Sequence, residues 1–118
     1  MSLRRVEILQ RAFCSEKQVP FVSALERDII GFARATVGLI PANGLRHPPS
    51  SGTTGWYIWF GEELSSEPDF FAPLHAEHIY DAHPELSRLL GMAPGYRFLL
   101  AGDYLDIWYD ESLLTIGN

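Results

Sequence analysis

The feature that most constrains this chain is a run of five large residues, four of them aromatic, enclosed by two glycines. The segment reads Gly55-Trp56-Tyr57-Ile58-Trp59-Phe60-Gly61. Bulky aromatic and β-branched residues at this density are typical of a strand inside a core. Because alternate side chains of a strand point to opposite faces, Trp56, Ile58 and Phe60 should meet the core, and Tyr57 and Trp59 should lie opposite. The run predicts the strand on which the other elements pack.

A hairpin is predicted near the C-terminus, with strands at residues 96–101 and 104–109. The intervening Gly102-Asp103 suits a two-residue turn that needs glycine first. Counting outward from this turn pairs Ala101 with Tyr104 and leaves one face entirely apolar or aromatic. A shift of one residue would mix polar and apolar side chains on that face, so the register is well determined. On the other face, Arg97 would lie beside Trp108 in a cation–π contact.

Helical periodicity dominates the first third of the chain. Apolar residues recur three and four positions apart between residues 2 and 14, which predicts an amphipathic helix. Residues 23–38 open with the capping-box pair Ser23 and Glu26 and continue as a second apolar stripe, so a second helix is predicted there. Residues 41–54 are rich in Pro, Gly and Ser and are predicted to form a loop. Short helical turns are expected at 73–80 and 84–91.

Helices followed by strands indicate the α+β class. We predict a single domain over residues 1–118, with a helical part at about 2–38, the loop at 41–54 and a sheet-containing part at 55–116. The N-terminal helices should pack on one face of a small antiparallel sheet that includes the hairpin 96–101/104–109.

The charge of the chain is divided unevenly along its length. The net charge is −6, but residues 1–59 carry seven basic and four acidic residues, whereas residues 60–118 carry two basic and eleven acidic residues. The net charge is therefore +3 for the first half and −9 for the second. Nucleic acid is disfavoured as a partner because phosphate binding needs clustered Lys and Arg. A basic protein partner is favoured, and the alternative is an acidic surface that only maintains solubility.

The chain has no apolar run near the ~20 residues that a bilayer-spanning helix needs. Its N-terminus lacks the apolar segment of a signal peptide. Cys14 is the sole cysteine, which excludes an internal disulfide and favours a reducing compartment. A cytoplasmic protein without membrane contact is therefore expected.

Aromatic residues beside acidic ones form the candidate binding surface, because Trp and Tyr are enriched among the residues that dominate interface energies. The predicted partner-binding residues are Trp59, Glu62, Glu63, Glu67, Asp69, Asp106 and Trp108. In the alternative interpretation both sheet faces are covered and the tryptophans belong to the core. A homodimer through the same face is a further alternative.

One group of residues has metal-ligand chemistry, namely His75, Glu77 and His78. Two histidines three positions apart share a helical face, but a zinc site needs a third or fourth ligand and the HExxH spacing is absent. Glu62 and Glu63 would point to opposite faces and form no catalytic pair. We therefore expect no enzyme and no cofactor, and His75 and His78 are weak metal candidates. The alternative function is a small metal-dependent or ligand-binding enzyme centred on these three residues.

Four segments together resemble a known family. They are Gly55 to Glu63, Asp69 to His78, Pro94 to Leu99 and Asp106 to Asp110. Over residues 55–114 the chain resembles the immunity proteins of bacterial polymorphic toxin systems and their uncharacterised relatives. This resemblance implies a cytoplasmic inhibitor that binds a cognate toxin, and it transfers no catalytic residue. The predicted function is thus a non-enzymatic binding protein that masks a basic toxin through its acidic, aromatic second half.

Overall fold

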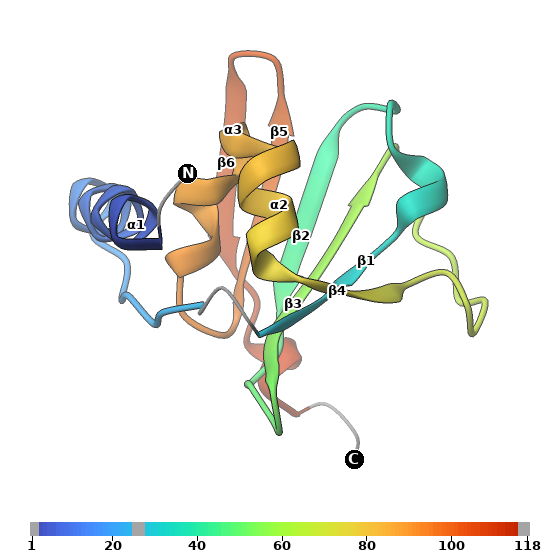
Figure 1. Cartoon of the computed structure of the whole chain (residues 1–118), viewed down its shortest axis with the longest axis horizontal. Coiled ribbons are helices and arrows are strands. Elements are labelled where there is room, and N and C mark those ends of the chain that lie inside the picture. The colour runs from blue at the N-terminus through green and yellow to red at the C-terminus, as the bar shows by residue number, and fades with distance from the viewer. Residues whose placement is uncertain (1–2, 25–27, 116–118) are drawn as a thin grey trace.

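The fold is built on a six-stranded mixed sheet, seen in a computed structural model that describes residues 3–24 and 28–115 (Figure 1). The strands are β1 (Ile29–Phe32), β2 (Ala42–Arg46), β3 (Thr53–Phe60), β4 (Ala72–His75), β5 (Tyr96–Ala101) and β6 (Tyr104–Tyr109). Their order across the sheet is β4-β1-β3-β2-β5-β6. The chain is therefore α+β, as predicted.

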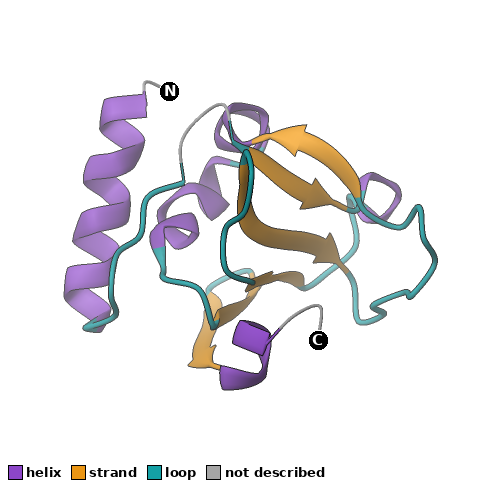
Figure 2. Cartoon of the chain, turned by 90° about the horizontal axis from the view of Figure 1, so that it is seen from below, coloured by secondary structure: helices purple, strands orange, loops and turns teal. Residues whose placement is uncertain are grey.

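The helices gather on one side of this sheet (Figure 2). They are α1 (Leu3–Lys17), α2 (Ala76–Ala82) and α3 (Pro84–Ser87), together with the 3₁₀ turn η2 (Arg88–Gly91). Two further 3₁₀ turns are η1 (Arg34–Thr36) and η3 (Glu111–Thr115). The helix α1 packs mainly on η2 and α3, which continue the layer begun by α2. The turn η3, next to the C-terminus, lies on the opposite side of the sheet. No helix in the described part of the chain has the length and apolarity to cross a membrane.

The aromatic run forms β3, which lies inside the sheet between β1 and β2. The predicted alternation is confirmed. Trp56, Ile58 and Phe60 are buried in the larger core, under the helices. Tyr57 and Trp59 belong to a second cluster on the other face. The strand β3 therefore contributes side chains to two hydrophobic clusters, one on each face of the sheet.

The hairpin is confirmed in every predicted pair, from Ala101 opposite Tyr104 to Tyr96 opposite Tyr109. Gly102 has a φ of 59°, in the left-handed region that glycine tolerates and that this turn requires. Arg97 lies over the ring of Trp108, with its guanidinium carbon 5.4 Å from the ring centroid. The residues that follow form η3, and Asp110 accepts a hydrogen bond from the backbone N–H of Ser112 at its start.

The predicted helix at 23–38 is wrong, because residues 29–32 form the strand β1 and residues 34–36 the short turn η1. Strand β1 pairs with β4 on one side and with β3 on the other. Gly31 permits the second pairing, since a Cβ there would lie 2.6 Å from the Tyr57 ring. Non-local pairing thus overrides the helical pattern. The capping residue Glu26 lies outside the described residues.

The predicted loop at 41–54 is also wrong in part, because residues 42–46 form β2. Asn43 and Gly44 lie inside this strand, and the Phe98 ring occupies the space over Gly44 where a Cβ would stand. The expected antiparallel sheet is mixed, since β1 runs parallel to β3. Pro73, expected at a helix start, lies in β4 at the edge of the sheet. The open side of an edge strand has no neighbouring strand, so a proline without an N–H group is tolerated there.

Candidate protein-binding face

The face of the sheet opposite α2, α3 and η2 is the candidate binding surface, and we call it the outer face. Two rows of directly paired residues cross it from β3 to β6. One row consists of Trp59, Asn43, Leu99 and Asp106, and the other of Tyr57, Leu45, Arg97 and Trp108. Because paired residues of neighbouring strands point to the same side, the predicted residues Trp59, Asp106 and Trp108 do share one face.

The β3 end of the outer face is covered. Phe71 packs edge-on against Tyr57 and Trp59, with ring centroids 5.1 and 6.2 Å apart, and Phe70 packs on Phe71. Leu113 from η3 closes the same cluster. Trp59 is consequently only 5% exposed, so a partner would meet the residues that cover it rather than its own ring.

The β6 end of the outer face is open to solvent. Tyr104 is 61% and Trp108 38% exposed, and Asp106 between them is exposed too. The cation beside Trp108 is fixed by an ion pair, because Arg97 Nη1 lies 3.1 Å from Asp110 Oδ2. Hydrogen bonds from Ser112 and Arg97 lower the pKa of Asp110, which keeps the carboxylate charged.

The four predicted acidic residues of the segment 62–69 are all exposed. They are Glu62, Glu63, Glu67 and Asp69. The segment leaves the end of β3 and returns through Phe70 and Phe71, whose rings anchor it to the outer face. The structure therefore brings these four carboxylates together on one connection, separate from Asp106 and Trp108 on β6.

Two hollows adjoin this acidic segment, and a third lies next to one of them. One of about 780 Å³ is lined by Glu62 and Glu63 together with Leu39, Phe60 and Phe70. One of about 400 Å³ lies between Leu64, Tyr57 and Phe71. A third, of about 230 Å³, shares Leu39 and Phe60 with the first and has Glu85 in its wall. The first of these hollows combines an apolar floor with an acidic wall.

A fourth hollow, of about 560 Å³, lies over the other edge of the outer face. Gly31, Tyr57 and Pro73 line it together with residues 47–50. Its histidine, His47, is engaged, since Nδ1 lies 3.0 Å from the Leu113 carbonyl oxygen. The hollow is lined largely by apolar side chains, and its described lining residues include no free catalytic group.

Leu39 and Ile40 are interface candidates that the sequence reading missed. Both are strongly exposed, Ile40 at 76% and Leu39 at 58%, and they line the hollows beside Glu62 and Glu85. Exposed apolar side chains grouped beside acidic ones are unusual on a surface without a partner. A sequence signal existed, because the residue before a proline favours an extended conformation, in which Leu39 and Ile40 would point to opposite sides.

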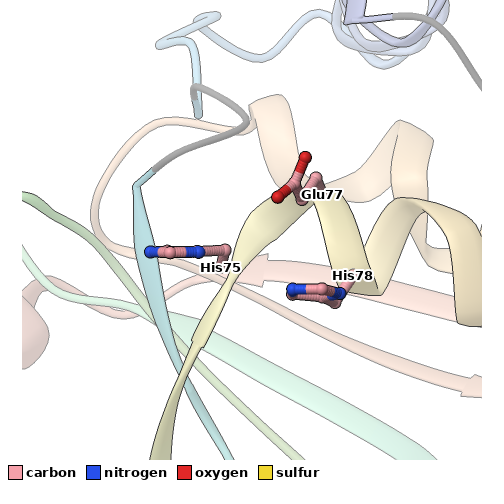
Figure 3. A group of neighbouring side chains, drawn as sticks. All are labelled: His75, Glu77 and His78. Carbon is pink, nitrogen blue, oxygen red and sulfur yellow. The ribbon is translucent and has the colours of Figure 1, made fainter.

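The metal-like group lies at a different place, where β4 meets α2 (Figure 3). His75 ends the strand, whereas Glu77 and His78 begin the helix, so the group is not on one helical face as the sequence suggested. One ligand atom from each residue lies within 4.8 Å of the other two, and all three side chains are exposed.

The comparison with protein families identifies the class. The family model of the Imm33-like domain matches residues 9–110, which is most of the chain. The protein therefore belongs to the Imm33-like domain family, an immunity-protein-like family. No curated protein and no solved structure matches it.

Family membership confirms the resemblance and extends it toward the N-terminus, since the match begins in α1 rather than at residue 55. It is consistent with a non-enzymatic role and suggests a protein partner. The open half of the outer face and the acidic segment are the surfaces on which such a partner could be held.

Proposed function

We propose that this protein is a cytoplasmic immunity protein that binds a basic toxin and masks its working surface without catalysing a reaction. The observation that carries the proposal is the exposed acidic segment 62–69, placed beside a hollow with an apolar floor. Membership in an immunity-protein-like family supports it.

The charges and the apolar groups have separate parts in this proposal. Glu62, Glu63 and their neighbours create a negative potential that speeds the encounter with a basic surface. Affinity comes mainly from side chains that become fully desolvated on binding, for which Leu39 and Phe70 are placed in the hollow and Trp108 on β6. Because Trp59 is already covered, it acts by supporting Phe71 and the segment above it.

The test uses an inactivated toxin domain encoded by a gene next to this one, with association followed by stopped-flow at low and at physiological salt. The double variant Glu62→Lys, Glu63→Lys should slow association roughly tenfold at low salt, and the difference should shrink as salt is added. Both carboxylates are exposed, so the fold should not change.

The matched control is the double variant Glu7→Lys, Glu16→Lys, which changes the net charge by the same amount on α1, away from the acidic segment. It should leave the association rate nearly unchanged. Equal slowing by both variants would show that only overall charge matters. If the neighbouring toxin domain does not bind the wild-type protein at all, the proposal fails.

A further inference from the structure

We propose that His75, Glu77 and His78 form a Zn²⁺ site at the junction of β4 and α2, a property separate from toxin binding. His75 is the N-cap residue of α2, and His78 is the third residue of the helix. Side chains at these two positions of a helix start normally meet, as in a capping box. Here the two imidazole rings lie stacked, 6.2 Å apart between centroids and tilted by 11°.

The structure places the third candidate ligand, Glu77, within reach of both histidines. Glu77 precedes His78 in the first turn of α2, and the ligand atoms of all three residues lie within 4.8 Å of one another. Figure 3 shows the carboxylate of Glu77 above the two rings. Two imidazoles and one carboxylate form a ligand set that zinc uses, with the fourth position left to water.

Zinc binding would require only a small movement of the three side chains. With zinc–ligand bonds of about 2.0–2.2 Å in tetrahedral geometry, neighbouring ligand atoms stand about 3.4 Å apart. The three side chains must therefore approach by less than about 1.5 Å from their 4.8 Å limit, through rotations about χ1 and χ2. All three are exposed, so no packed neighbour has to move.

Within residues 3–24 and 28–115, the two imidazole rings contact each other by stacking, and no hydrogen bond or ion pair holds the side chains of His75, Glu77 and His78 in another position. An ion would thus replace water rather than a protein partner. None of the three lines any of the four hollows described above, which favours binding of the ion over turnover of a substrate.

The experiment is calorimetric titration of the tag-free protein with zinc sulfate at pH 7.5, after treatment with a chelator. We expect one zinc ion per chain. Each of His75→Ala, His78→Ala and Glu77→Gln should weaken zinc binding at least about tenfold. Removing a residue that only hydrogen-bonds to a metal ligand already weakens metal binding by about tenfold or more, so loss of a ligand should cost at least as much. The matched control Glu85→Gln, an exposed acid in the first turn of α3, should bind zinc like the wild type.

The outcomes separate clearly. Absence of stoichiometric zinc binding by the wild type overturns the proposal, and so does binding that survives removal of either histidine. Unchanged binding by Glu77→Gln overturns the three-ligand site. Circular dichroism of the metal-free variants should match the wild type, because the replaced side chains are exposed, and a variant that unfolds is replaced by its Gln or Asn counterpart.

Discussion

At the residue scale, single polar side chains connect segments that lie far apart in the sequence. Arg46 is fully buried at the end of β2 and donates hydrogen bonds to the carbonyl oxygens of Val22, Ser23, Thr54 and Met92. Burial lowers its pKa to about 10, so the guanidinium is still charged at neutral pH. One side chain thereby ties the segment after α1 to the sheet and to the end of η2.

Asp110 gives a pH-dependent prediction. Its folded-state pKa is lowered by the hydrogen bonds from Ser112 and Arg97. A lowered carboxylate pKa contributes stability above the ordinary value of 3.8, and this stability is lost as pH falls through the folded value. The melting temperature of Asp110→Asn should therefore be lower than that of the wild type at pH 6, and the two should converge as pH falls below about 4.

Ser112→Ala tests the cause of this shift. It removes the hydroxyl that donates to Asp110 Oδ1 over 2.6 Å, so the carboxyl titration of Asp110 followed by NMR should move upward toward its ordinary range. A titration midpoint that does not move would mean that Arg97 and the backbone N–H of residue 112 suffice to hold the carboxylate in its charged form.

At the scale of elements, the sheet depends on two glycines that let aromatic rings lie over the backbone. Gly31 in β1 faces the ring of Tyr57, and Gly44 in β2 faces the ring of Phe98. Both strands lie in regions where the sequence predicted a helix or a loop. In each case an aromatic ring from a strand distant in the sequence fills the space beside the glycine, so the missing side chain leaves no gap in the sheet.

Gly44→Ala should consequently destabilise the protein by about 1–3 kcal/mol, the usual cost of overpacking a filled core. The added Cβ would stand where the Phe98 ring now lies. Urea denaturation measures the loss. Phe98→Leu made alone and together with Gly44→Ala provides the control, since a smaller side chain should absorb part of the clash and make the two effects non-additive. Strict additivity would show that the clash is relieved elsewhere.

At the scale of the whole molecule, the two sheet faces differ in how far they are covered. The helix-facing side is buried at its central strands, with Trp56 1% exposed, whereas its side chains on β6 are only partly buried. The outer face is covered at β3 by Phe70, Phe71 and Leu113 and becomes open toward β6. The acidic segment and the open strands therefore belong to one side of the molecule, and the helices to the other (Figures 1 and 2).

This difference predicts which tryptophan a small neutral quencher reaches. Trp108 is 38% exposed, whereas Trp56 and Trp59 are nearly inaccessible. Acrylamide should quench part of the wild-type fluorescence, and that part should disappear in Trp108→Phe. If a homodimer covers the outer face, quenching of the wild type should instead increase on dilution as the dimer separates.

The sequence by itself determined the elements that depend on local pattern. Alternation placed Trp56, Ile58 and Phe60 on one face of a central strand, and the apolar face of 96–109 allowed only one register for the hairpin. The composition of the second half likewise indicated where acidic groups gather. The strand faces follow from the alternation of side chains, and the hairpin follows from its turn residues. Both depend only on residues that are close together in the sequence.

Only the tertiary structure decided the rest, because it depends on partners distant in the chain. Residues 29–32 became a strand because two strands flank them, and residues 42–46 became one because Phe98 needs the space over Gly44. Trp59 is buried because Phe71 returns twelve residues later to cover it. Burial is a property of contacts made after the chain has folded, so the same aromatic run could indicate a core without indicating which of its rings a partner would meet.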